Sequence, residues 1–248
     1  MIKIKTMAEI NAMRDASKIV KDTLDLIESK IQVGMTTKEL DTIAHDYIIS
    51  VGGYPACLGY YGFPASTCIS VEEMVVHGIP SDDVVIKDGQ IVSVDITALY
   101  NGFHGDAART FMVGNVSSEK RKLVEVTKEC FFKGLDAVGI GAPIGNIGHA
   151  IQTHAESNGF SVVRDFVGHG IGVDMHEDPN IPNFGHKGTG IRLKEGMVIC
   201  IEPMINMGTH KLDFLSDGWG VVTRDRLPSA HYENTVAITE DGVEVLTL

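Results

Sequence analysis

Apolar residues recur at helical spacing in two stretches near the start of the chain. Thr6 opens the first stretch with the spacing of a capping box, and apolar positions then repeat every three or four residues as far as Ile31. A second capping box begins at Thr36, and Gly52-Gly53 would end its helix. The pattern predicts two amphipathic helices, of which the first stops near Gly34.

Two strand-like runs follow an irregular segment, 54–86, that is rich in Gly, Pro and aromatic residues. Asn101-Gly102 joins the runs, and Asn-Gly is a preferred pair for a two-residue hairpin turn because both residues need a positive φ. Such a turn pairs Thr97 with Asp106. Asp95 and Asp106 then share one face of the hairpin as diagonal neighbours, about 7–8 Å apart.

The second half of the chain repeats the order of two helices followed by strands. Helical spacing resumes from Ser117 to about Val138 and from Pro143 to Gly159, and strand-like runs follow at 196–202 and, after a long loop, 233–239. At a constant offset of 107 residues, the helix ends and one strand of the two halves match, and Asp95 falls on Glu202. We interpret this register as an internal duplication with a pseudo-twofold relation.

No Pro- or Ser-rich linker separates the two repeats. We therefore expect an α/β (α+β) fold in a single domain, 1–248, with pseudo-symmetric halves of about 1–114 and 115–248.

The composition is that of an ordinary globular protein, with 44% hydrophobic and 22% charged residues. A formal net charge of -12 argues against a nucleic-acid-binding surface, which normally needs a basic patch. No apolar run reaches the roughly 18 residues of a membrane span, and the sequence does not open with a signal peptide. The four cysteines form no CxxC pair and are expected to be free thiols. We expect a cytoplasmic protein without a membrane or direct nucleic-acid partner.

The two Asp residues of the hairpin need an explanation, since Asp is depleted in strands and is seldom buried unpaired. One alternative is a solvated face, and another is an ion pair between one Asp and Arg109. Arg109 lies an odd number of residues from Asp106 and therefore faces the opposite side. The flanking residues are apolar, which indicates strands covered on both sides. The hairpin favours a site for a hard cation, because such ions prefer oxygen ligands.

Three groups of the second half extend this candidate site. His169 lies in a glycine-rich segment, Glu202 ends an apolar strand, and Glu233 begins another. Each alone has a simpler explanation, as a structural histidine or a solvated carboxylate. With Asp95 and Asp106 they form the set of two Asp, two Glu and one His that two adjacent divalent cations need. A structural zinc site would instead favour Cys at tetrahedral spacing.

Two more histidines, His77 and His176, lie outside this ligand set. A neutral imidazole beside the cations can donate a hydrogen bond to a substrate carbonyl or to a developing oxyanion. We therefore expect both residues to contact the substrate.

Nine short motifs, in order over nearly the whole chain, show that the sequence resembles the type I methionine aminopeptidases of bacteria. They are Tyr60-Tyr61-Gly62-Phe63-Pro64, Cys68-Ile69-Ser70, His77-Gly78-Ile79-Pro80, Asp95 with Asp106, Gly168-His169-Gly170-Ile171-Gly172, Met175-His176-Glu177-Asp178-Pro179, Ile201-Glu202-Pro203-Met204, Asp217-Gly218-Trp219 and Tyr232-Glu233-Asn234-Thr235. The resemblance implies the pita-bread fold, with the duplicated halves around a central antiparallel sheet. It also implies removal of the initiator methionine from new polypeptides when the next residue is small.

The resemblance implies roles for particular residues. The metal ligands would be Asp95, Asp106, His169, Glu202 and Glu233, with Asp106 and Glu233 bridging the two ions. The wall of the methionine pocket would be formed by Cys57, Tyr60, Phe63, Cys68 and Trp219, a sulfur- and aromatic-rich lining that suits a thioether. Met175 and Tyr61 depart from residues common in bacterial relatives, and we expect Met175 to make the pocket wall more adaptable.

The expected reaction is attack on the scissile carbonyl by a hydroxide that bridges the two cations. His77 or His176 would stabilise the oxyanion, and Glu202 would carry a proton to the departing nitrogen. Co, Mn, Fe, Ni and Zn all suit an oxygen-rich site with one imidazole, so the sequence leaves the metal open.

Two rival functions share this fold. An X-Pro dipeptidase or aminopeptidase has the same five ligands, but those relatives carry an additional N-terminal domain, for which the first helix at Thr6 leaves no room. A non-catalytic binding module would have lost ligands, whereas all five positions are filled here. We expect a monomer that acts on nascent N-termini and makes at most transient contact with the ribosome.

Overall fold

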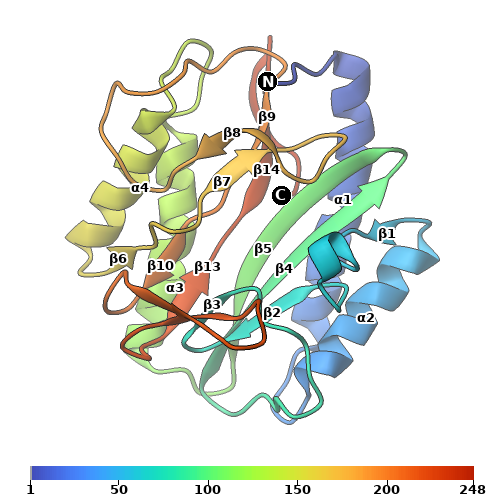
Figure 1. Ribbon diagram of the computed structural model, residues 1–248, viewed down its shortest axis with the longest axis vertical. Coiled ribbons are helices and arrows are strands. Elements are labelled where there is room, and N and C mark those ends of the chain that lie inside the picture. Colours follow the sequence, from blue (N-terminus) through green and yellow to red (C-terminus); the bar gives the residue numbers. More distant parts are fainter. Residues whose placement is uncertain (1) are drawn as a thin grey trace.

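A long antiparallel hairpin lies at the centre of the structure, a computed structural model that describes residues 2–248 (Figure 1). Its strands are β4 (Gln90–Tyr100) and β5 (Phe103–Val113). Asn101 and Gly102 adopt φ values of 50° and 82°, as the predicted turn requires. Thr97 is paired with Asp106, so the predicted register is confirmed.

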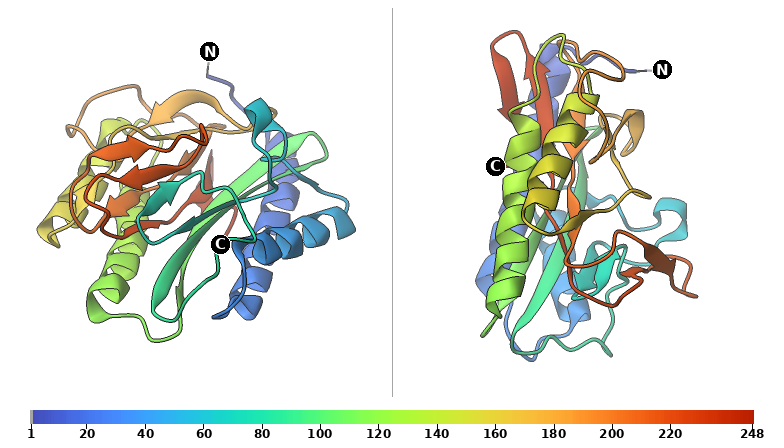
Figure 2. Two further views of the ribbon diagram at one scale, coloured as in Figure 1. Left: turned by 60° about the horizontal axis from the view of Figure 1, so that its bottom comes forward. Right: turned by 90° about the vertical axis from the view of Figure 1, so that its left-hand side faces the viewer.

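The helices and the remaining strands surround this hairpin (Figures 1 and 2). The helical elements are α1 (Met7–Lys30), α2 (Thr37–Ser50), η1 (Tyr60–Gly62), α3 (Ser118–Leu135) and α4 (Gly145–Ser157). The other strands of the first half are β1 (Tyr54–Pro55), β2 (Cys68–Val71) and β3 (Met74–Val76). Those of the second half are β6 (Ser161–Val162), β7 (Gly168–Gly170), β8 (Glu177–Ile181), β9 (Val198–Ile201), β10 (Met204–Asn206), β11 (Leu212–Phe214), β12 (Val221–Thr223), β13 (Ser229–His231), β14 (Asn234–Thr239) and β15 (Gly242–Val245).

Both N-terminal helices begin as the sequence predicts. The side chains of Thr6 and Thr36 accept the backbone N–H three residues later, and the Glu at that later position bonds back to the cap. The end of α1 differs from the prediction, because Ile31 takes up an extended backbone. Gly34 then lies beyond the helix at φ 92°, where its N–H donates to the carbonyl of Ile86. Likewise α3 ends at Leu135, three residues before the predicted Val138.

The prediction that 54–86 is irregular was wrong in part, since the segment contains β1, β2 and β3. These strands have only two to four residues each, too few for an alternating pattern to stand out among Gly and Pro. Their pairing matters for the site. β2 lies beside β4 and places Cys68 opposite Asp95. The long loop before 233–239 likewise contains β10 to β13.

All strand pairs among residues 2–248 are antiparallel, and the two larger sheets meet at one place. One sheet holds β1, β2, β4 and β5, and the other runs in the order β15-β14-β9-β7-β8. Ala108 of β5 and Glu233, just before β14, exchange two backbone hydrogen bonds of 3.0 and 3.3 Å. This junction joins the halves of the chain and, as Figure 1 shows, runs through the middle of the molecule.

Each half has its own core, as a duplication predicts. One cluster of buried residues joins α1 and α2 to β4 and β5, and another joins α3 and α4 to the strands of the second half. The helices gather toward one side in the right-hand view of Figure 2, and the short strands and loops lie on the other. That residues 1–248 form a single domain stays a prediction. No helix within the described residues 2–248 is both long and apolar enough to cross a membrane.

Candidate metal centre

Strand register places four carboxylates around one point. Asp95 and Asp106 lie on the same face of β4 and β5, with one residue pair, Ile96 and Ala107, between their positions in the ladder. Residues 201 and 234 are paired between β9 and β14, so Glu202 and Glu233 lie opposite one another at the strand ends. The junction at Ala108 brings these two pairs together.

His169 completes the cluster from β7. A side chain at Gly168 would lie 2.3 Å from the carbonyl oxygen of Cys200, and one at Gly170 would lie 2.3 Å from that of Asp178, so only glycine allows this close packing. The Nδ1 of His169 donates to the carbonyl oxygen of Gly170 at 2.9 Å. That bond leaves the lone pair of Nε2 free to bind a metal, as a hydrogen bond at the other ring nitrogen does in metal-binding histidines.

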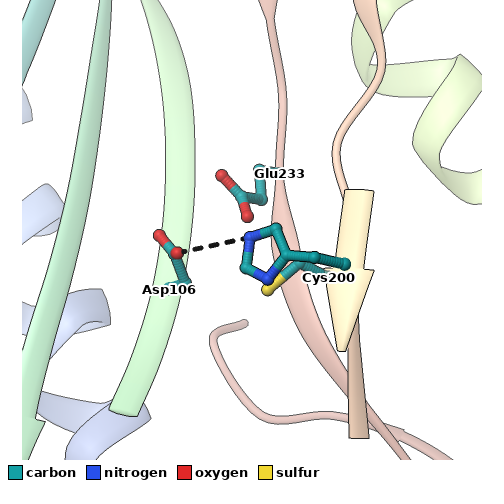
Figure 3. Close-up of side chains that lie close together, drawn as sticks. Asp106, Cys200 and Glu233 are labelled. Atoms are coloured by element: carbon teal, nitrogen blue, oxygen red, sulfur yellow. Dashed lines mark ion pairs between the residues drawn. The ribbon is translucent and has the colours of Figure 1, made fainter. Parts of the chain in front are cut away.

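The distances from His169 show that the carboxylates surround its ring. Its Nε2 lies 3.5 Å from Glu202 Oε1 and 3.8 Å from Asp106 Oδ2. Figure 3 shows Asp106 and Glu233 reaching from neighbouring strands toward this point, with the ion pair to Asp106 dashed. Ligand atoms of Asp106, His169, Cys200 and Glu233 all lie within 4.8 Å of one another.

Within residues 2–248, two carboxylate oxygens of this cluster are buried without any hydrogen-bond partner, Asp106 Oδ1 and Glu233 Oε1. Burial raises the pKa of both groups, and the nearby carboxylates raise it further. Burial likewise raises the pKa of Asp95 to about 7. Protein groups do not offset so much buried negative charge, whereas divalent cations would. The residues therefore fit a metal site.

Cys200 belongs to the same group of atoms but differs in chemistry from the ligands. It is fully buried, with its sulfur 3.8 Å from the Thr235 hydroxyl. Burial raises the pKa of its thiol well above the usual range, as do the neighbouring carboxylates. A protonated thiol is a poor metal ligand. We therefore do not count Cys200 among the candidate ligands, although its sulfur lies close to them.

His231 is a site residue that the sequence analysis missed. It ends β13, is 2% exposed and lines the same cavity as the carboxylates. Burial lowers its pKa to about 3. The signal in the sequence is its position two residues before Glu233, which places both side chains on one side of an extended segment.

A cavity of about 240 Å³ opens beside the cluster. All twelve residues that the sequence analysis singled out line it, namely Cys57, Tyr60, Phe63, Cys68, His77, Asp95, Asp106, His169, His176, Glu202, Trp219 and Glu233. Its apolar part is a small packed cluster in which Phe63 contacts Trp219 edge-on, with ring centres 5.1 Å apart. Met175 belongs to this cluster and is 5% exposed.

His77 and His176 both line the cavity. Tyr60 Oη shares a hydrogen bond of 2.7 Å with His176 Nδ1, and the ring of His176 lies 4.2 Å from that of His169. The His77 ring packs edge-on against Phe166 at 5.3 Å. Burial lowers the pKa of His77 to about 4, so its imidazole is neutral at pH 7 and can donate a hydrogen bond without carrying charge.

A buried ion pair holds the segment that carries His176. Lys5 Nζ lies 2.7 Å from Glu177 Oε2, and the two side chains are 5% and 2% exposed. Burial acts to raise the pKa of Glu177, but the bonds from Lys5 and from the Asp174 N–H outweigh it and lower that pKa overall.

We expect Lys5→Met to lower the free energy of unfolding by up to about 3–5 kcal/mol, because the buried Glu177 carboxylate would keep only the half-exposed Lys3, 3.3 Å away, as a cationic partner. The ion pair stabilises the protein at pH values above about 4, the usual pKa of glutamate. This contribution is lost as the pH falls below that value. Thermal unfolding of metal-free protein at pH 7 and pH 3.5 measures it, with Lys21→Met in an exposed pair as the control. Equal melting temperatures for Lys5→Met and wild type at pH 7 would contradict the argument.

Arg109 lies on the opposite face of the sheet, as its odd separation from Asp106 in the sequence predicts. From there it hydrogen-bonds to the backbone of Glu233. Its guanidinium donates to the carbonyl oxygens of Ala108 at 2.8 Å and Glu233 at 2.6 Å, and to Asn234 Oδ1 at 2.6 Å. It also lies 4.3 Å above the Tyr232 ring. The forked arrangement of N–H groups in the guanidinium thereby fixes the backbone on both sides of the junction.

We expect Arg109→Lys to weaken metal binding about 10–100-fold, the usual effect of losing a residue that holds a metal ligand in place. Lysine keeps the positive charge but lacks the several N–H groups with which the guanidinium bonds to both strands. Isothermal titration of the metal-free protein measures the effect. Arg14→Lys, which changes a surface pair with Glu244, is the matched control. Equal affinities for the two variants would show that Arg109 does not position the site.

The chain is similar to proteins of one known family. The model of "Metallopeptidase family M24" matches residues 11–240. A methionine aminopeptidase of Clostridium perfringens is 54% identical over 248 residues, covering 100% of this chain and 99% of that protein.

Solved structures agree with the sequence comparison. The crystal structure of methionine aminopeptidase from Rickettsia prowazekii matches with a TM-score of 0.98 and 44% identity, covering 100% of both chains. A prolidase from Pyrococcus furiosus matches with a TM-score of 0.78 and 26% identity, but this chain covers only 65% of it. The predicted pita-bread fold is thereby confirmed, because its metallopeptidases are the structural neighbours.

Proposed function

Because the chain belongs to metallopeptidase family M24, we propose that it removes methionine from the N-terminus of polypeptides, as a metal-dependent aminopeptidase. The single observation that carries this is the cluster of four carboxylates and His169 at the end of an apolar, sulfur-lined cavity. Its two unpartnered buried oxygens fit a metal site, and the full-length likeness to methionine aminopeptidases gives the reaction.

In this proposal two divalent cations would be held by Asp95, Asp106, His169, Glu202 and Glu233. Asp106 and Glu233 would be the ligands that both cations share, since each belongs to the group of atoms that surrounds His169 and each has an unpartnered oxygen. Bound cations supply an activated water at neutral pH and polarise the scissile carbonyl. The metal is one of Co, Mn, Fe, Ni and Zn.

The remaining groups orient the substrate and move a proton. His77 and His176 donate hydrogen bonds to the scissile carbonyl oxygen, and Tyr60 holds the His176 ring at Nδ1. Glu202 carries the proton to the departing nitrogen. Its Oε1 lies 3.5 Å from His169 Nε2, and its side chain lines the cavity in which the substrate would lie.

The cavity favours methionine through its apolar wall. Phe63, Trp219, Cys57 and Cys68 offer aromatic edges and sulfur to a thioether, with Tyr60 at the rim. Met175 has three rotatable bonds and can adjust to the bound side chain. In this proposal a small residue follows the methionine, as the resemblance to the bacterial methionine aminopeptidases implies.

The substrates in this proposal are nascent N-termini in the cytoplasm, and the protein acts as a monomer that meets the ribosome only transiently. The four cysteines support this location, because they are free and buried and suit a reducing compartment.

The test is hydrolysis of Met-Ala-Ser, Met-Trp-Ser and Ala-Pro-Ser by metal-free protein, before and after addition of Mn or Co. Metal-dependent release of methionine from Met-Ala-Ser alone is the expected result. Cleavage of Ala-Pro-Ser instead would move the chain to the prolidase branch of the family. Metal binding without any cleavage would leave a binding protein, and the proposal would fail.

A further inference from the structure

The backbone of His231 is held by hydrogen bonds to Thr110. The Thr110 hydroxyl accepts the His231 N–H at 2.9 Å and donates to the His231 carbonyl at 2.8 Å. The residue is also paired with Met204 in β10. Its side chain is 3% exposed and faces the cavity of the metal cluster. These contacts fix the backbone from which the imidazole extends into the cavity.

Within residues 2–248, His231 Nε2 is buried and has no hydrogen-bond partner. It lies 3.8 Å from Glu233 Oε2, which is too long for a hydrogen bond. Ligand atoms of Asp95, His231 and Glu233 all lie within 4.8 Å of one another. Two atoms that are each about 2.1 Å from one ion lie at most about 4.2 Å apart, so the 3.8 Å separation fits a shared cation.

Glu233 faces both imidazoles of the cluster. It belongs to the group around His169 and to the group around His231, whereas Asp106 belongs only to the first and Asp95 only to the second. The two groups share Glu233, and each contains one imidazole.

We infer that His231 is a sixth protein ligand, which binds the cation on the Asp95 side through Nε2. This inference rests on the proposed two-cation site. Each cation then has one nitrogen donor, and a site with nitrogen on both sides favours transition metals over Mg, which prefers oxygen and water.

The test uses the full chain loaded with two equivalents of Co²⁺ and ¹H NMR. Each cobalt-bound imidazole gives one solvent-exchangeable N–H signal that the unpaired electrons shift far from the diamagnetic range. Wild type should give two such signals. His231→Gln should lose one and keep the other, and His169→Gln should lose the second. His149→Gln, on an exposed face of α4, is the control and should keep both.

Calorimetric titration of the same variants gives a second readout. His231→Gln should raise the dissociation constant of one cation at least 10-fold, the lower end of what losing even an outer-shell group costs, and leave the other within about twofold. His231→Asn, with a shorter side chain, should behave alike, and circular dichroism identifies a variant that fails to fold.

The outcomes separate this inference from the proposed function. Two bound Co²⁺ ions with methionine release, but one shifted signal that survives His231→Gln, would overturn the sixth ligand alone. A wild type that binds fewer than two ions would overturn both.

Discussion

Asp106→Asn should bind divalent metal more than about 100-fold more weakly than wild type and lose methionine release to a similar degree. Loss of an outer-shell partner already costs about 10–100-fold, and Asp106 is in the proposal a ligand to both cations. The amide keeps the shape of the side chain but offers one oxygen and no charge. Metal content by atomic emission and initial rates on Met-Ala-Ser measure the two effects on one preparation.

The control for this variant is Asp15→Asn, at an exposed position of α1. We also expect metal-free Asp106→Asn to be at least as stable as metal-free wild type, because one buried charge beside Glu233 is gone. Full activity of Asp106→Asn, or activity in a preparation without metal, would contradict the bridging role.

Chelation should lower the melting temperature of the wild type by about 10–20 °C. A cation present at 100 times its dissociation constant stabilises the folded state by about 2.7 kcal/mol, so two cations contribute about 5 kcal/mol. A chain of this size shifts by about 2–4 °C for each kcal/mol. Scanning calorimetry with excess Mn, and again with chelator, measures the difference.

The same scans of Asp106→Asn should show little dependence on Mn, which separates binding at the cluster from binding elsewhere. A wild type that melts at one temperature with and without metal would show that its buried carboxylates are stable without cations.

The sequence predicts the parts of this fold that local chemistry determines. The capping boxes at Thr6 and Thr36 and the Asn101-Gly102 turn each depend on a few neighbouring residues, and all three are present in the structure. The hairpin register followed from that turn, and so did the shared face of Asp95 and Asp106.

What the sequence did not predict depends on distant contacts. β2 has four residues and forms because β4 provides its pairing partner. β13, with three residues, is also too short to be recognised from its own sequence. The sequence alone did not indicate His231 for the same reason, because the position of its backbone depends on Thr110 in another strand. The placement of His169 against Glu202 and Asp106 likewise depends on the packing of β7 against β9. The resemblance, and not the residue pattern alone, gave the roles that were expected there.

The junction between β5 and β14 determines when the enzyme can become competent during its own synthesis. Glu233 precedes β14, the next-to-last strand within residues 2–248. It is the last of the five proposed ligands to be translated, and the cluster cannot close until its backbone bonds to that of Ala108. The first half can collapse around its hairpin earlier, but the proposed metal centre cannot assemble before Glu233 has been made. Newly made copies of this protein would therefore depend on older copies for any N-terminal processing that precedes the synthesis of Glu233.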